Sequence, residues 1–136
     1  MSAPSHPHRE TGEDAIRSAG ASAAGLRAFV RIAELWHLSV AEQLTLLGIS
    51  SRSTYFKWRK DPGARLPRDT LERLSYLLGI FKALQVLLPV PQAADEWIRQ
   101  PNREPLFAGR SALERMLDGK VADLFVVRQY LDSQRG

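Results

Sequence analysis

Apolar side chains recur at three- and four-residue steps along most of this chain, which is the spacing of amphipathic helices. The pattern starts near Gly25 and runs through Trp36, then resumes over residues 40–47. Ser39 precedes this second run, and Glu42 follows three residues later. This pair forms a capping box, in which the serine hydroxyl accepts from the Glu42 amide and the glutamate reaches back to the serine amide. The pattern therefore predicts two helices joined by a short connection.

The next segment predicts another short helix. Gly48 ends the preceding one, because glycine accepts the left-handed conformation that a helix C-terminus requires. Ser50 or Ser51 caps a helix that reaches Lys60. The sequence Asp61-Pro62-Gly63 is a strong turn signal that ends it. Two short helices with a tight turn between them have the dimensions of a helix-turn-helix.

A long helix is predicted from about Arg68 to Leu88. Gly79 inside it indicates either a close crossing with another helix or a break. Arg73 lies among the polar positions that we expect to face solvent. The buried stripe of this helix is predicted to consist of Leu71, Leu74, Leu77, Leu78, Phe81, Leu84 and Leu88.

Prolines and a second capping box divide the rest of the chain. Pro89 and Pro91 end the long helix and open the next, which Pro101 closes. A loop with two prolines and a glycine follows over 101–110, and Ser111 begins the second capping box. The helices predicted for this half cover residues 91–100, 111–118 and about 120–133.

No segment shows the period-two alternation of a β-strand, so the sequence predicts an all-α fold. We expect a helix-turn-helix domain over 25–88, packed on a helical C-terminal domain over 89–136. Residues 1–24 are rich in Pro, Ser, Gly and Ala, with Ile16 as the single large aliphatic residue after Met1. Such a segment buries little apolar surface, so the sequence predicts a disordered tail there.

Composition narrows the class of protein. The 136 residues are 44% hydrophobic and 25% charged, which is typical of a folded globular chain. The absence of cysteine excludes disulfides and thiolate metal sites. Apolar stretches are too short to span a membrane, and no signal peptide is evident, so we expect a cytoplasmic protein without membrane contact. His6 and His8 form a pair with no further ligand nearby, so no metal or cofactor is expected.

The net charge of +4 is concentrated in the middle of the chain. Residues 51–88 carry eight basic and three acidic side chains, whereas residues 89–136 carry seven of each. In a helix-turn-helix, the N-terminal residues of the second helix meet base edges and basic residues along it contact phosphates. An alternative is that Thr54 and Trp58 simply form the inward face of a packed helix. The DNA-binding residues predicted on this basis are Ser51, Arg52, Ser53, Lys57, Arg59 and Lys60.

Catalysis has no support in the sequence. It contains no nucleophile elbow, no zinc-protease motif and no glycine-rich phosphate loop. The acids after residue 88 are interleaved with bases, as on a solvated surface. We expect a protein that is not an enzyme.

Several motifs in the second half occur in a fixed order. They are Leu74-Ser75-Tyr76-Leu77-Leu78-Gly79-Ile80, Ala83-Leu84, Trp97-Ile98-Arg99-Gln100-Pro101-Asn102, Leu106-Phe107-Ala108-Gly109-Arg110-Ser111-Ala112-Leu113 and Gly119. Over roughly residues 34–135 the chain resembles the Xre/MbcA/ParS family of type II antitoxins. The resemblance implies a RES-domain toxin as partner, which either degrades NAD or transfers its ADP-ribose to a protein. It also implies that the C-terminal part of the antitoxin covers the toxin's active site.

The residues themselves suit such a role. Trp97 precedes a proline-bounded loop that it can anchor by packing, and Asn102 can satisfy the backbone of the turn. The last helix is apolar on more than one side, which favours a partner on a second face. Its arginines could fill a pocket shaped for a nucleotide phosphate. The predicted toxin-binding residues are Trp97, Asn102, Leu106, Phe107, Val126, Val127, Arg128, Tyr130 and Arg135.

Two functions from different classes remain open. In the first, the chain is an antitoxin that also represses its own operon by binding operator DNA, as a homodimer or within a larger toxin–antitoxin hetero-oligomer. In the second, it is a stand-alone helix-turn-helix transcriptional regulator whose C-terminal helices serve dimerisation or sensing.

Overall fold

The computed structural model describes the backbone of residues 12–135 and the side chains from residue 20 onward, and this part of the chain contains helices and no strand. The predicted all-α fold is therefore confirmed. An isolated antiparallel bridge between Pro101 and Ser111 closes the base of the loop between α5 and α6. The helices are α1 (Gly12–Leu35), α2 (Val40–Leu47), α3 (Arg52–Lys60), α4 (Arg68–Leu87), α5 (Pro91–Trp97), α6 (Ala112–Met116) and α7 (Val121–Arg135).

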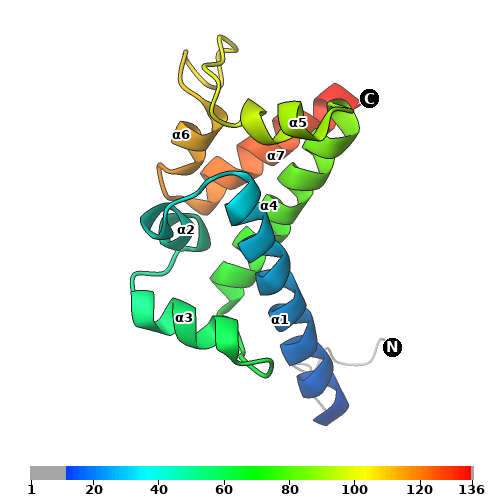
Figure 1. Cartoon of the computed structure of the whole chain (residues 1–136), viewed down its shortest axis with the longest axis vertical. Helices are drawn as coiled ribbons and strands as arrows, with labels where there is room; N and C mark the ends of the chain where they lie inside the picture. Colours follow the sequence, from blue (N-terminus) through cyan, green and yellow to red (C-terminus); the bar gives the residue numbers. More distant parts are fainter. Residues whose placement is uncertain (1–11, 136) are drawn as a thin grey trace, which may run out of the picture.

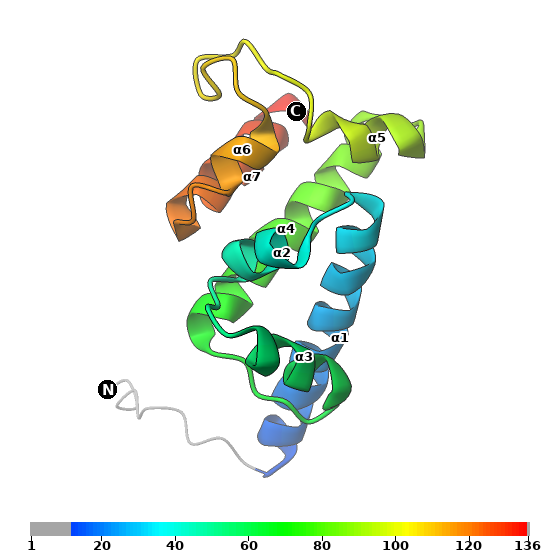
Figure 2. The same ribbon diagram turned by 60° about the vertical axis from the view of Figure 1, so that its left-hand side comes forward.

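Helix α4 is the central element of the molecule (Figure 1). It packs most extensively against α7, next against α1, and it also contacts α2 and α5. Figure 2 shows α1 and α7 on either side of α4, with α2 and α3 stacked below α6. The long apolar stripe of α4 therefore packs against two helices, α1 and α7, rather than one.

One hydrophobic core runs through both halves of the chain. It includes Phe29 of α1, Trp36 just after α1, Tyr55 of α3, and Leu124 and Leu131 of α7, all at most 2% exposed. The predicted boundary between residues 88 and 89 coincides with the end of α4. Because α4 packs on both α1 and α7, this boundary is not a linker between separately packed units.

Two arginines fasten the C-terminal helices to the helix-turn-helix through backbone carbonyls. Arg73 of α4 donates to the carbonyl of Thr45 at 3.4 Å and to that of Gly119 at 3.0 Å. Arg99, just after α5, donates to the carbonyls of Trp36 and His37 at 3.0 and 2.8 Å. Carbonyls near the ends of helices lack partners of their own, so cationic donors stabilise them well.

The prediction of a disordered tail over residues 1–24 is wrong from residue 12 onward, because α1 begins at Gly12. Ser22 and Ala23 are buried, with 5% and 8% of their surfaces exposed. The segment has a single large aliphatic residue, Ile16, but alanine has the highest helix propensity, and small side chains such as those of Ser22 and Ala23 allow close packing. Residues 1–11, including His6 and His8, lie outside the described part of the chain.

The predicted buried stripe of α4 is right only in part. Leu74, Leu77 and Leu84 are buried as expected, whereas Leu78, Phe81 and Leu88 are only partly buried. Leu71 is 40% exposed, whereas Arg73, which was expected to face solvent, is 8% exposed. At Gly79 the chain makes the close crossing that was one of two predicted possibilities: a Cβ atom there would collide with the Arg128 guanidinium of α7. Glycine therefore allows the Arg128 side chain to cross the surface of α4.

Candidate functional site

The helix-turn-helix is held by a buried hydrogen-bond chain between its two helices. The Tyr55 hydroxyl donates to Gln43 Oε1 at 2.6 Å, and Gln43 Nε2 donates to the Leu38 carbonyl at 3.0 Å. Tyr55 is fully buried, whereas Thr54 and Trp58, the expected inward face of α3, are only partly buried. Burial raises the pKa of the Tyr55 hydroxyl, and the Arg59 guanidinium nearby opposes this shift in part. The hydroxyl therefore stays a donor at neutral pH.

Local signals explain the ends of the two helices. Ser39 and Glu42 form the predicted capping box of α2, and Gly48 ends that helix with a φ of 69°. Ser51 caps α3 by accepting from the Thr54 amide at 3.1 Å. Because the Ser51 hydroxyl is used in this way, its predicted role in DNA contact is secondary to capping.

The remaining predicted DNA-binding residues share the exposed surface of α3. This surface consists of Arg52, Ser53, Lys57, Arg59 and Lys60. Among the described residues, no carboxylate lies within ion-pair distance of its four basic side chains. An uncompensated cationic helix surface suits a polyanion.

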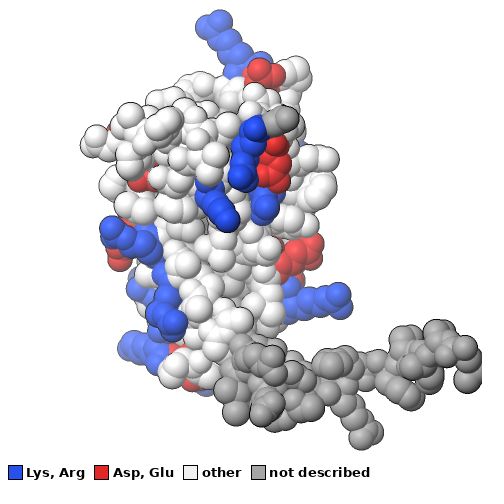
Figure 3. Space-filling view, turned by 90° about the vertical axis from the view of Figure 1, so that its right-hand side faces the viewer, with Lys and Arg blue, Asp and Glu red and all other residues white. Residues whose placement is uncertain are grey.

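Charge is arranged differently on other faces. Seen from the right-hand side of Figure 1, basic and acidic side chains lie close together in the upper part, and below them charged side chains stand on both sides of an uncharged central strip (Figure 3). The ion pairs Arg110–Asp118 and Arg115–Asp123, at 2.8 and 3.1 Å, belong to the C-terminal half. The hydrogen bond from Arg110 lowers the pKa of the Asp118 carboxyl. The unpaired positive charges of α3 therefore differ from these ion-paired arginines of the C-terminal half.

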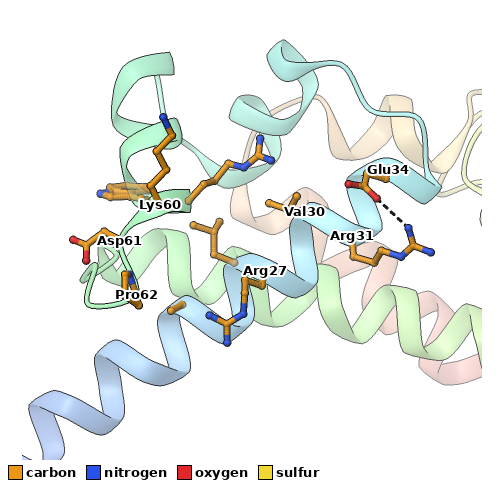
Figure 4. Close-up of a pocket in the computed structure, with 11 residues that line it drawn as sticks. Arg27, Val30, Arg31, Glu34, Lys60, Asp61 and Pro62 are labelled. Carbon is orange, nitrogen blue, oxygen red and sulfur yellow. Dashed lines mark hydrogen bonds and ion pairs between the residues drawn. The ribbon is translucent and has the colours of Figure 1, made fainter.

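A groove of about 440 Å³ separates α1 from the end of α3 (Figure 4). Leu26, Val30 and Trp58 contribute apolar surface, and Arg27 and Lys60 point away from each other on its two sides. Arg31 pairs with Glu34 of the same helix at 3.0 Å. Since Arg27 and Lys60 diverge, one DNA strand lying on the outer surface of α3 would not reach both.

The C-terminal half contains a cluster of three aromatic rings, which we call the aromatic clamp: Trp97, Phe107 and Tyr130. The ring centroids of Trp97 and Phe107 lie 6.0 Å apart, those of Phe107 and Tyr130 lie 5.3 Å apart, and those of Trp97 and Tyr130, which are stacked, lie 6.5 Å apart. The clamp joins α5, the 101–110 loop and α7. Trp97 therefore packs on the loop as expected, and Tyr130 completes the contact.

Backbone and side-chain hydrogen bonds shape the 101–110 loop. Asn102 Oδ1 accepts from the Glu104 amide at 2.9 Å, and the Asn102 backbone pairs with Arg110 and Gly109. The Arg115 guanidinium donates to the Leu106 carbonyl at 3.1 Å. The amide of Asn102 thus satisfies the turn, as predicted from the sequence.

The structure divides the predicted toxin-binding residues into groups with different exposure. Phe107 and Val127 are fully buried, so they support the surface from beneath and offer no side-chain area to a partner. Trp97, Leu106 and Tyr130 are partly exposed beside the loop. Val126 is also partly exposed and stands one helical turn before Tyr130 on α7.

The arginines lie on another flank of α7. Arg128 Nε donates to Asp132 Oδ2 at 3.0 Å while its guanidinium lies over Gly79 of α4. Arg135 also reaches Asp132, at 3.9 Å. The predicted toxin-binding residues with exposed surface therefore lie on two flanks, an aromatic flank near the loop and an arginine flank near α4.

Some functional features were missed at the level of sequence. Tyr55 and Gln43 are twelve positions apart, and no local pattern indicates that they bond. The one hint in the sequence was an aromatic residue, Tyr55, between the basic residues Arg52 and Lys57. Among the described residues no group of histidine and acidic side chains could hold a metal ion, and no helix there is long and apolar enough to cross a membrane.

Comparison with known proteins agrees with this geometry. Residues 15–79 match the model of the antitoxin Xre-like helix-turn-helix domain, and residues 83–136 match that of the antitoxin Xre/MbcA/ParS C-terminal toxin-binding domain. The class of protein is thus an antitoxin, with a helix-turn-helix followed by a toxin-binding domain. The chain belongs to the Xre/MbcA/ParS family of antitoxins. The two matched ranges meet inside α4.

The chain is also similar to the uncharacterized protein y4oB of Sinorhizobium fredii (strain NBRC 101917 / NGR234). The two are 55% identical over 113 residues, which cover 83% of this chain and 85% of that protein. The alignment therefore extends over most of both the helix-turn-helix and the toxin-binding domain.

Proposed function

We propose that this antitoxin neutralises a RES-domain toxin by covering the entrance of the toxin's active site. The toxin would use NAD, which it either degrades or consumes by transferring ADP-ribose to a protein. The family resemblance supports the identity of the toxin. The observation that carries the proposal is the partly exposed aromatic flank, Trp97, Leu106, Val126 and Tyr130, which leads directly into the exposed last turn of α7.

The aromatic flank supplies the apolar part of this interface. Trp97 and Tyr130 stack with an interplanar angle of 13° and are held from beneath by the buried Phe107 ring. Rigid aromatic side chains bury a large area at little entropic cost and are enriched where interfaces bind most strongly. The clamp therefore presents a preformed apolar surface to the toxin.

The last turn of α7 supplies the polar part. Asp132 to Arg135 are exposed, and the 3.9 Å contact between Arg135 and Asp132 is weak enough to exchange for another anionic group. We assign Arg135 to the phosphate-binding region of the toxin's NAD pocket. Arg128 has a supporting role, because Asp132 and α4 already hold its guanidinium.

Co-expression with the product of the neighbouring gene tests the proposal. We expect the antitoxin to co-purify with that protein and to restore both cell growth and the cellular NAD level. The double variant Arg52→Ala/Lys57→Ala is a matched control, because it alters only α3 and should protect equally well. A stand-alone regulator would bring down no such partner, and the NAD level would not respond to it.

We further propose that the helix-turn-helix binds operator DNA and represses the antitoxin's own operon. The uncompensated charges of Arg52, Lys57 and Lys60 on α3 support this second function. A dimer, or a toxin–antitoxin assembly that presents two such units, would bind paired half-sites more tightly than one unit. Both functions place the protein in the cytoplasm, and neither requires catalysis or a cofactor.

Binding to a double-stranded fragment of the DNA upstream of the gene tests this function. We expect binding that weakens as salt rises, and a further loss in the Arg52→Ala/Lys57→Ala variant. Equal binding by the variant and the wild type would remove α3 from the interface.

A further inference from the structure

We propose that Arg52, Phe56 and Arg59 form a preformed clamp for the phosphodiester backbone of DNA, in which Phe56 is the positioning residue. The inference rests on the proposed DNA-binding function. It adds that two of the contacting groups are already held in place before DNA arrives.

The three side chains meet on one face of α3. Phe56 follows Arg52 by four residues and precedes Arg59 by three, so the helix brings all three together. The Arg52 guanidinium carbon lies 5.4 Å from the centroid of the Phe56 ring, and that of Arg59 lies 5.1 Å from it. Arg59 also lies 5.6 Å from the Tyr55 ring centroid. Phe56 thus holds two cations, each within the range of a cation–π interaction.

The two guanidinium groups keep their hydrogen-bonding edges free. Among the described residues, neither Arg52 nor Arg59 donates to a side chain or a carbonyl, and no carboxylate approaches either within ion-pair distance. Arg73, Arg99 and Arg115, in contrast, donate to carbonyls or carboxylates of the chain. Stacking uses the flat face of a guanidinium and leaves its N–H groups available for the paired oxygens of a phosphate.

Phe56 has a smaller structural task than Tyr55, since it packs at the edge of the core with its ring centroid 5.4 Å from that of Tyr55. It is partly exposed, whereas its neighbour Tyr55 fills the core and bonds Gln43. A long side chain that is already held in one region loses less freedom when a phosphate fixes it there. The ring therefore increases the affinity of the arginines for phosphate without touching DNA itself.

The first experiment compares full-length variants in binding a double-stranded fragment of the DNA upstream of the gene. Phe56→Leu removes the ring, and we expect binding about tenfold weaker from the lost positioning of two arginines. Phe56→Tyr keeps the ring and should bind like the wild type. Trp58→Leu is the matched control, because it removes a partly exposed ring of the same helix over which no guanidinium lies. It should leave the affinity within about threefold of the wild type.

Salt dependence separates positioning from direct contact. Arg52→Ala and Arg59→Ala should each reduce the slope of log K against log salt by about 0.9, since each removes one phosphate contact. Phe56→Leu should lower the affinity but leave the slope nearly unchanged. In a double-mutant cycle, the loss caused by Arg52→Ala should shrink in the Phe56→Leu background.

The outcomes distinguish the Arg52–Phe56–Arg59 clamp from the proposed DNA-binding function as a whole. If the arginine variants weaken binding while Phe56→Leu binds like the wild type, the clamp is overturned and DNA binding by α3 stands. If Arg52→Ala, Lys57→Ala and Arg59→Ala all bind like the wild type, the proposed DNA-binding surface itself fails. Should Phe56→Leu not fold, Arg59→Lys keeps the charge and the ring but removes the planar stack. It should still weaken binding several-fold, and unchanged affinity overturns the clamp.

Discussion

At the scale of single residues, Arg73 shows how one buried cation joins three segments. It is 8% exposed, and its guanidinium donates to Asp69 of its own helix, to the end of α2 and to the connection before α7. Gly48 makes room for this arrangement, because a Cβ atom there would lie 2.5 Å from Arg73 Nε. A buried charge is tolerated only when it is paired and its donors have acceptors, and here the Asp69 carboxylate and two backbone carbonyls accept from Arg73.

Replacing Arg73 by methionine should therefore destabilise the protein strongly. The methionine fills much of the volume, but it removes the ion pair with Asp69 and the side-chain donor to the Gly119 carbonyl, while the Thr45 carbonyl keeps the Gly48 amide. We expect a loss of about 3 kcal/mol in the free energy of unfolding. Urea denaturation measures this loss. Arg68→Met, an exposed position on the same helix, is the control and should change stability by less than about 0.5 kcal/mol. A loss at Arg73 as small as at Arg68 would contradict the assigned role.

The sequence predicted little of this residue-level detail. Arg73 occupies a polar position of α4 by periodicity alone, and its burial depends on Gly119, which is forty-six residues away. Arg128 likewise looked available for a partner until its contact with Gly79 placed it against α4. Periodicity reports which face of a helix is apolar, but a long cationic side chain can be buried by segments distant in the chain.

At the scale of elements, most helices were predicted because their start and stop signals are local. Both capping boxes, at Ser39 and at Ser111, form as expected, and Gly48 ends α2. The start of α1 was missed because its first turns lack an apolar stripe. What sequence patterns do not contain is the pairing between elements, such as the bond from Tyr55 of α3 to Gln43 of α2.

The hydrogen bond from Tyr55 to Gln43 predicts that the helix-turn-helix loses stability at alkaline pH. Burial raises the pKa of Tyr55 above the ordinary value of about 10. Because the folded-state pKa exceeds the unfolded one, the stabilisation is fully present below about pH 10 and is lost as the pH rises through the folded-state pKa. We expect the advantage of the wild type over Tyr55→Phe, about 1–2 kcal/mol at neutral pH, to shrink in this alkaline window. Unfolding measured at several pH values checks this, and a pH-independent difference would contradict it.

The aromatic clamp gives a prediction for the C-terminal elements. Phe107 is fully buried and contacts both Trp97 and Tyr130 edge-on, whereas Trp97 is partly exposed. Phe107→Ala should therefore cost about 4 kcal/mol and Trp97→Ala somewhat less, about 3 kcal/mol. Both should release the 101–110 loop and weaken toxin binding. Denaturation and a toxin pull-down measure the two effects, and a Trp97→Ala variant with full stability and full neutralisation would refute the anchoring role.

At the scale of the whole molecule, the two functional surfaces belong to one packed body. Helix α4 contributes to the core of both halves, and Arg73 and Arg99 fix the remaining contacts. The basic surface of α3 and the aromatic flank near α7 are built on different elements of this body (Figure 1). Each surface can therefore be altered alone, which allows toxin binding and the proposed DNA binding to be tested separately.

We propose that the C-terminal end of the antitoxin closes the NAD pocket of its toxin. Truncation after Leu131 tests it cleanly, because Leu131 is buried whereas Asp132 to Arg135 are exposed. The truncated protein keeps the aromatic clamp and the DNA-binding helix, so it should still fold, still bind DNA and still associate with the toxin.

The decisive measurement is NAD turnover by the purified toxin as each antitoxin form is titrated into it. The full chain should abolish turnover at a stoichiometric ratio. The truncated chain should bind the toxin while most of the turnover remains, since the pocket is no longer closed. Complete inhibition by the truncated chain would contradict closure of the pocket by the C-terminal end and would place the inhibitory surface on the 101–110 loop instead.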